Sequence, residues 1–277
     1  MARFAIGDDL APRAASGVVM IALALTATYV GGFYFVAFWG LAALGVAWEW
    51  QRMIGGERVW LRTLVAALAL VAAAPLAMFA PAGLSLLLLV AGAVAVGATA
   101  EAERRVSAGA GVLYAGAAML APALLRASPT QGLAAMLWVY AIVWGTDIGA
   151  YFGGRLIGGP KLWPAVSPGK TWSGAGVGAV VSTVLAVMAA ALSVPVALRW
   201  IPLIEIGLIT SVASQGGDLF ESAMKRRAGV KDSSRLIPGH GGLMDRLDGF
   251  IVGASVAAVI AWVRSEGPWI APGLLVW

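Results

Sequence analysis

The chain has 277 residues, of which 60% are hydrophobic and 12% are charged. Soluble globular domains carry about 45–50% apolar and about 25% charged residues, so the composition excludes a soluble protein of the usual kind. There is no cysteine, which excludes disulfides, thiolate metal ligands and cysteine nucleophiles. The formal net charge of +5 reflects membrane topology and contact with anionic lipid headgroups, and we expect no nucleic-acid partner.

Apolar runs follow one another along nearly the whole chain. They begin after an N-terminal segment that we expect to be retained, because acidic residues and a proline interrupt it. A helix needs about 20 apolar residues to span a bilayer. The sequence therefore predicts an all-α integral membrane protein with about nine transmembrane helices. The predicted spans are residues 14–30, 32–48, 61–80, 82–100, 108–125, 132–152, 174–194, 200–216 and 249–263.

The basic residues test this topology independently of hydropathy. With the N-terminus inside, sixteen of the 19 lysine and arginine residues fall in inside segments, and only Arg126, Arg199 and Arg264 fall outside. Positive charge stays on the cytoplasmic side of a membrane. The N-terminus is therefore predicted to be cytoplasmic and the C-terminus periplasmic, with an odd number of crossings.

Two of the inside loops are longer than the topology requires, and they hold most of the remaining polar residues. They are residues 153–173 and 217–248, both within residues 131–277, which we expect to form the catalytic region. Residues 1–130 are expected to form five scaffold spans that make dimer or lipid contacts.

Three aspartates of the second loop lie near hydrophobic segments: Asp218, Asp245 and Asp248. The last two are spaced i and i+3, so they share one face of a helix. Carboxylates in such surroundings need a compensating charge, either from basic side chains or from a divalent metal. Without cysteine and with one histidine, the oxygen ligands favour Mg²⁺ over Zn²⁺. These residues alone leave a salt-bridge network equally open, with Arg226, Arg227 and Arg246 as its basic members.

A glycine-rich turn, residues 238–242, lies between these acids. Gly241 and Gly242 allow positive φ and close backbone approach, which suits N–H groups arranged around a phosphate, although an ordinary tight turn has the same composition. His240 is the only histidine, so it cannot form a zinc site; a lone histidine is more often a hydrogen-bonded structural group than a ligand or base.

The first loop combines a buried acid with a Gly-Lys-Thr segment. Asp147 lies inside the sixth apolar run, shortly before Arg155, where an acid is costly unless it is paired or metal-bound. Ser167 and Lys170 precede the seventh span, and the start of a helix favours anions. A helix cap with an interfacial lysine is the alternative for Lys170. The segment is not a Walker A sequence, because the required glycine and the preceding strand are missing.

Acids suited to Mg²⁺, glycine-rich turns and basic residues thus recur in two loops on one side of the membrane. This combination favours phosphoryl or nucleotidyl transfer, in which catalysis depends mostly on charge neutralisation and positioning. The expected substrates are a phosphate-bearing lipid and a cytosolic nucleotide. The alternative from another class is an ion-coupled transporter, which would place ionisable residues near mid-membrane, where these spans have almost none.

Residues 222–248 carry a spaced set of polar positions, and their order resembles the signature of phosphatidate cytidylyltransferases, the CDP-diacylglycerol synthases. The matching positions are Ser222, Lys225, Arg226, Lys231, Asp232, the run 238–242, Asp245, Arg246 and Asp248. Residues 147–155 with 167–172, and residues 215–222, resemble the same family. The motifs cover roughly the C-terminal half, and the N-terminal spans match only in hydrophobic character. Ser173 departs from the family, which commonly has glutamate at this position.

The resemblance implies that CTP and phosphatidic acid react to give CDP-diacylglycerol and pyrophosphate. It also implies a homodimeric enzyme of the bacterial inner membrane, with its active site facing the cytoplasm. Mg²⁺ would be required, with a monovalent cation such as K⁺ as a second ion. The alternative within enzymes is a CTP-dependent polyprenol or lipid kinase, which would release CDP and no pyrophosphate.

Residue roles follow from the resemblance as a hypothesis. Asp218 and Asp245 fall on the family's metal-binding aspartates and would hold Mg²⁺, and Asp248 would hold a second cation or orient Arg246. Lys225 completes the expected catalytic set of Asp218, Asp245 and Asp248. Three basic residues would neutralise phosphates, namely Lys170, Lys225 and Arg226. The expected substrate-binding residues are Asp147, Ser167, Lys170, Ser222, Arg226, His240, Gly241, Gly242 and Arg246.

Overall fold

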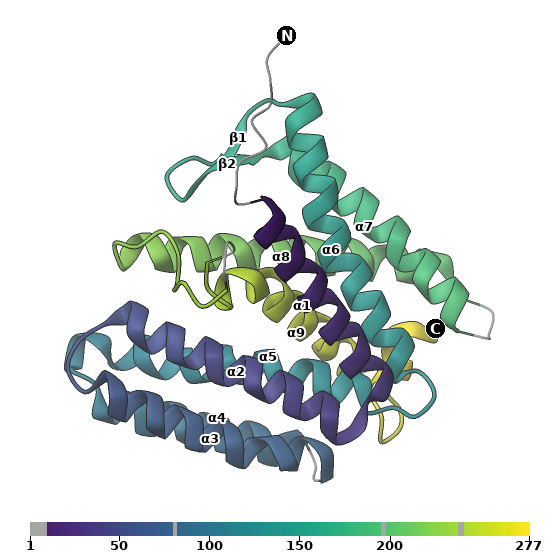
Figure 1. The fold of residues 1–277 in the computed structure, drawn as a ribbon. Coiled ribbons are helices and arrows are strands. Elements are labelled where there is room, and N and C mark those ends of the chain that lie inside the picture. The colour runs from purple at the N-terminus through teal and green to yellow at the C-terminus, as the bar shows by residue number, and fades with distance from the viewer. Residues whose placement is uncertain (1–9, 80–81, 195–197, 238–240) are drawn as a thin grey trace.

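The computed structural model describes residues 10–79, 82–194, 198–237 and 241–277, and these residues form a bundle of long helices (Figure 1). The expected helical architecture is confirmed, with one short two-stranded hairpin in addition. The elements in chain order are α1 (Leu10–Val30), α2 (Gly32–Ile54), α3 (Val59–Phe79), α4 (Ala82–Thr99), the 3₁₀-helix η1 (Ala102–Arg104), α5 (Arg105–Arg126), α6 (Gly132–Ile157), β1 (Lys161–Trp163), β2 (Ser167–Thr171), α7 (Trp172–Ser193), α8 (Trp200–Arg227), α9 (Met244–Arg264) and α10 (Ala271–Leu275).

Within the described residues, seven helices are long and apolar enough to cross a membrane: α2, α3, α4, η1 continued by α5, α6, α7 and α9. Helix α1 adds a shorter apolar stretch, Ala15–Val30, and α8 carries acidic and basic residues in its C-terminal part. Large apolar side chains such as Phe79 and Leu192 are exposed on the outside of the bundle, which suits contact with hydrocarbon. The chain is a multi-pass membrane protein, and the number of nine spans stays a prediction.

Helix α8 continues well beyond the end of the predicted span at residue 216 and stops at Arg227. The prediction of a loop over 217–248 is therefore wrong for its first part, because the apolar run ends at residue 216 but the helix does not. An ion pair spaced i,i+4 stabilises this extension, with Lys225 Nζ 2.6 Å from Glu221 Oε2. Asp218 and Lys225 thus project from a rigid helix.

The connection between α6 and α7 is a β-hairpin that was not predicted. Helix α6 continues to Ile157, so the predicted loop 153–173 begins too early, and Gly158 follows with φ +68°, which glycine adopts without strain. Strands β1 and β2 are antiparallel, with Lys161 opposite Thr171. The hairpin leads the chain from the end of α6 directly into α7.

Helices α6 and α7 pack closely along small residues. Gly145, Gly149 and Gly153 recur every four residues on α6 and face α7. A Cβ atom at Gly178 of α7 would lie 2.7 Å from the carbonyl oxygen of Thr146, so no larger residue fits there without a shift of the backbone. Small residues allow such close approach between helices in membranes. The pair fixes the end of α6 against the start of α7.

Replacing Gly178 by alanine is expected to destabilise the protein by about 1–3 kcal/mol, as overpacking of a close contact does. Gly176 lies on the same helix, and a Cβ atom there meets nothing within 4 Å. The control variant Gly176→Ala should leave the protein as stable as the wild type or slightly more stable, because alanine is the better helix former. Thermal unfolding in one detergent compares the two; equal stabilities would contradict the close packing.

The N-terminal helices pack directly against α9. The indole ring of Trp39 on α2 stacks on Phe250 of α9, with ring centroids 4.3 Å apart. Both rings belong to one apolar core. A second apolar core surrounds Trp50 at the end of α2 and includes Met244, the first residue of α9. Both apolar cores therefore join the predicted scaffold region to the predicted catalytic region.

Candidate active site

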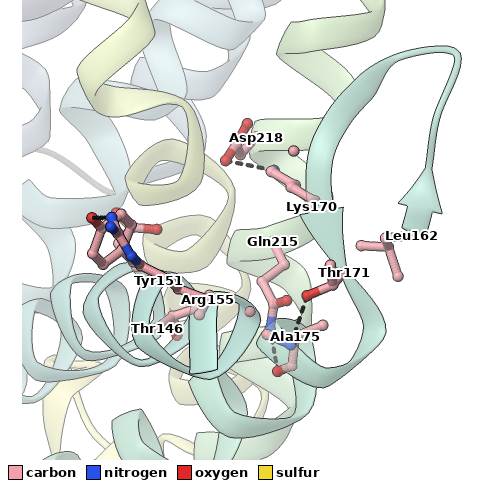
Figure 2. A pocket seen from close by; sticks show the side chains of 14 residues that line it. Thr146, Tyr151, Arg155, Leu162, Lys170, Thr171, Ala175, Gln215 and Asp218 are labelled. Atoms are coloured by element: carbon pink, nitrogen blue, oxygen red, sulfur yellow. Dashed lines mark hydrogen bonds and ion pairs between the residues drawn. The ribbon is translucent and has the colours of Figure 1, made fainter. Parts of the chain in front are cut away.

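A cavity of about 580 Å³ opens among α6, β2, the start of α7 and α8 (Figure 2). Its polar lining brings together residues that lie far apart in the sequence: Asp147, Tyr151, Arg155, Lys170, Gln215 and Asp218. Three of these were predicted to bind substrate or metal, and they come from both predicted loops. The volume lies within the range of about 300–1,000 Å³ that is common for small-molecule sites.

Lys170 and Asp218 form an ion pair across the cavity, with Nζ 2.5 Å from Oδ2 (Figure 2). The β-hairpin carries Lys170 to this position, and α8 carries Asp218. Both side chains are about one-third exposed, so each remains accessible to a ligand. Ser222 lies one helical turn beyond Asp218, and its hydroxyl donates a hydrogen bond of 3.4 Å to Asp218 Oδ1. These three predicted residues therefore meet at one place.

Thr171 explains why the Gly-Lys-Thr segment ends where a helix begins. Its hydroxyl oxygen accepts a hydrogen bond of 3.1 Å from the backbone N–H of Gly174 and so caps the N-terminus of α7. Ser173 donates from its hydroxyl to the carbonyl oxygen of Gly158, which holds the start of α7 against the end of α6. A helix cap is thus present at Thr171, and Lys170 beside it pairs with Asp218.

Two more carboxylates lie within electrostatic range of Asp218. Asp147 projects from α6 into the cavity, and Asp248 projects from the first turns of α9. The positive charge of Lys170 interacts electrostatically with both carboxylates, and that of Arg246 interacts with the carboxylate of Asp147. Asp248 Oδ1 also accepts a hydrogen bond of 2.7 Å from the backbone N–H of Gly249. Asp147 and Asp218 thus line the cavity together with Lys170 and Arg155, and Asp248 lies within electrostatic range of both acids.

A second charged cluster lies where α8 meets α9. Lys225 Nζ is 2.6 Å from Glu221 Oε2 and 2.8 Å from Asp245 Oδ1, and all three side chains are nearly or fully buried. Asp245 also accepts backbone hydrogen bonds from Ser233, at 3.1 and 3.2 Å, and from Gly242, at 2.9 Å. Lys225 therefore compensates two buried acids, and Asp245 holds the chain that leads into α9.

Comparison with known proteins identifies the family of this chain. The model of a family described as "Cytidylyltransferase family" matches residues 11–263. The chain belongs to this family. A phosphatidate cytidylyltransferase of Brucella suis is 36% identical over 260 residues, which cover 94% of this chain and 96% of that protein. The Bacillus subtilis phosphatidate cytidylyltransferase is 44% identical over 130 residues, covering 46% of this chain and 47% of that one.

The remaining residues of the expected cytidylyltransferase site have separate positions in the fold. Ser167 lies near the turn of the hairpin, opposite Trp163. Arg226 donates to the carbonyl oxygen of Val230 at 3.2 Å and so closes the end of α8. Arg246 lies on α9 between Asp245 and Asp248. His240 lies outside the described residues.

Gly241 and Gly242 make close contacts with other residues of the protein. Gly241 has φ +86°, and a Cβ atom there would lie 3.0 Å from Asp245 Oδ2. A Cβ atom at Gly242 would collide with the hydroxyl of Ser233 and lie 2.8 Å from Glu49 Oε1. In this structure the space beside Gly242 is thus occupied by Ser233 and Glu49, and its N–H donates to Asp245. The expected approach of a phosphate to these glycines stays a prediction.

The donor set fits Mg²⁺ at Asp218 better than at Asp245. Proteins bind Mg²⁺ through one or two carboxylates, with waters and substrate phosphates completing the octahedron. Both carboxylates already have partners, but the Asp218 side chain is 33% exposed and its contacts come from side chains, whereas the Asp245 side chain is 6% exposed and also accepts backbone hydrogen bonds. Across the described ranges, no three or more His, Asp or Glu side chains are grouped so that they could hold a metal ion together.

The sequence analysis assigned no role to Glu49 or Glu221, although Glu221 lies in the matching segment 215–222. Both are fully buried and lie among the residues of the second cluster. For Glu49 the available signal was its position directly after the predicted span 32–48, because an ionisable residue at the end of a span is a candidate for function. Glu221 also stands four residues before Lys225, a spacing at which side chains meet on a helix.

Proposed function

We propose that this protein transfers CMP from CTP to phosphatidate and releases CDP-diacylglycerol and pyrophosphate. The observation that carries the proposal is the Lys170–Asp218 pair at a cavity that Asp147 also lines, in a chain of the cytidylyltransferase family. The named activity of the relatives from Brucella suis and Bacillus subtilis supports the same reaction.

The proposed chemistry is an in-line displacement. An oxygen of the lipid phosphate forms a bond to the α-phosphorus of CTP, while the bond from that phosphorus to the oxygen bridging to the β-phosphate breaks. Pyrophosphate leaves with the bonding electrons. The lipid phosphate is already an anion, so no strong general base is required, and charge neutralisation dominates.

The chain's residues bind and orient the two anions. Lys170 exchanges its contact with Asp218 for a phosphate oxygen, because both groups are accessible and a partly exposed ion pair contributes little free energy. Asp218 would hold Mg²⁺, which supplies charge neutralisation for the triphosphate when bound. Asp245 would join it only after exchanging a backbone contact, and Asp248 would hold K⁺ or orient Arg246. Lys225 keeps Asp245 in place within the same site.

The topology is part of the proposal. The distribution of lysine and arginine supports nine spans, a cytoplasmic N-terminus and a periplasmic C-terminus. The enzyme would then lie in the bacterial inner membrane, with membrane lipids around it and its active site facing the cytoplasm, where CTP is found. Resemblance to the family supports a homodimer.

The experiment uses purified protein in lipid nanodiscs with phosphatidate and CTP labelled either at the α- or at the γ-phosphorus. We expect the α-label in the lipid product and one pyrophosphate released for each product formed. Chelation of divalent cations by EDTA should abolish the reaction, and added Mg²⁺ should restore it. Label from the γ-position in the lipid would instead identify a kinase, and no transfer of either label would reject the proposal.

A further inference from the structure

Glu49 is a buried carboxylate that belongs to the N-terminal helices but contacts the signature segment. It lies near the end of α2, is fully buried, and accepts four hydrogen bonds. Two come from hydroxyls, those of Ser233 at 3.0 Å and Ser234 at 2.5 Å. Two come from backbone N–H groups, those of Leu243 at 2.8 Å and Met244 at 2.6 Å. All four donors lie within residues 233–244.

These contacts give α9 its N-terminal cap. The first N–H groups of a helix lack partners within the helix, and Leu243, the N-cap residue of α9, offers no side-chain hydrogen bond. The carboxylate of Glu49 fills this place from a different helix, and its negative charge interacts favourably with the helix dipole. A buried carboxylate requires such donors, so Glu49 and the start of α9 stabilise each other.

Glu49 and Asp245 hold the same stretch of chain from two sides. Ser233 donates from its hydroxyl to Glu49 and from its backbone N–H to Asp245. Gly242 donates to Asp245, and its missing side chain leaves room for Glu49 and Ser233. Asp245 in turn contacts Lys225 at 2.8 Å. A chain of direct contacts therefore runs from α2 to the charged cluster.

We propose that Glu49 is a positioning residue for nucleotidyl transfer: it anchors residues 233–237 and 241–244 and thereby sets the position of Asp245. The N-terminal helices would then take part in forming the active site. This role rests on the proposed function for its effect on turnover, whereas the anchoring of the segment does not depend on it.

The main test compares Glu49→Gln with Gln51→Leu. Gln51 lies on the same helix, is equally buried, and donates to the carbonyl oxygen of Ala108, away from the signature segment. Glutamine at position 49 keeps the side-chain volume, but its NH₂ group is a donor and would face the hydroxyl and N–H donors that the carboxylate of Glu49 accepts from. We expect kcat for CDP-diacylglycerol formation to fall about 10- to 100-fold in Glu49→Gln, because small displacements of reacting groups have effects of this size. Gln51→Leu should keep the wild-type kcat, and Glu49→Asp should recover part of it.

The second readout is limited trypsin cleavage after Arg235, an exposed residue within the anchored segment. Cleavage should be about 10-fold faster in Glu49→Gln and in the Ser233→Ala/Ser234→Ala double variant, because each removes hydrogen bonds that hold residues 233 and 234 in place. The serine variant keeps the buried carboxylate and so serves if Glu49→Gln does not fold.

The outcomes separate the two claims. Faster cleavage and a lower kcat in both variants, but not in Gln51→Leu, would support the positioning role. Wild-type kcat in a folded Glu49→Gln variant would overturn it, as would an equal loss in Gln51→Leu. If the wild-type protein transferred no CMP, the proposed function would fail, while cleavage after Arg235 would still decide whether Glu49 anchors the segment.

Discussion

Asp218→Asn is expected to lower kcat for CDP-diacylglycerol formation by about 100- to 1,000-fold, the effect of removing one well-placed electrostatic contact from a reacting centre. Asparagine keeps the shape of the side chain but loses the charge that pairs with Lys170 and would attract Mg²⁺. The rate should be measured over a range of Mg²⁺ concentrations. The matched control is Glu205→Gln, the same loss of charge at an exposed position on the same helix, which should leave kcat unchanged.

A second substitution separates the metal role of Asp218 from its ion pair. Lys170→Met removes the partner but leaves the carboxylate, and we expect a higher KM for one substrate or a kcat lowered about 10-fold, because one phosphate contact is lost. If the ion pair were the only role of Asp218, both variants would show the same defect. Normal turnover of Asp218→Asn at saturating Mg²⁺ would rule out the metal assignment.

The sequence was sufficient to predict the helical membrane fold, because apolar runs and basic loops follow directly from the physics of the bilayer. The sequence also indicated which segments contribute to one site, since Asp147, Lys170 and Asp218 line the same cavity. The end of α8 was misplaced because hydropathy detects where a span ends, whereas Glu221 and Lys225 continue the helix through a local ion pair. A helix can continue beyond its apolar run, so the end of that run does not mark the end of the helix.

The β-hairpin and the role of Glu49 could not be predicted for a different reason. The strands of the hairpin have only three and five residues, too few for an alternation of apolar and polar residues to be recognised. The partners of Glu49 lie more than 180 residues further along the chain, so only the packing of α2 on α9 brings them together. Likewise, spacing alone could not show that Asp245 accepts backbone hydrogen bonds.

Lys225→Met is expected to destabilise the folded protein by about 3–5 kcal/mol, the usual cost of removing one member of a buried ion pair. Its ammonium group lies between Glu221 and Asp245, and methionine fills the space but leaves two buried carboxylates without a cation. Unfolding should be followed by heat and by denaturant in one detergent. The matched control is Lys231→Met, an exposed lysine nearby, which should change stability by less than about 0.5 kcal/mol.

A double-mutant cycle tests whether the loss arises from uncompensated charge. In the Lys225→Met background, Glu221→Gln removes one of the two unpaired acids and should recover part of the lost stability, whereas in the wild-type background it should destabilise, because it breaks the 2.6 Å ion pair. This change of sign is the diagnostic result, and additive effects would contradict the buried cluster. If Lys225→Met kept its stability but lost turnover, Lys225 would act on substrate phosphate as the sequence predicted. Loss of both would show that the same lysine maintains the fold around Asp245 and the activity that depends on it.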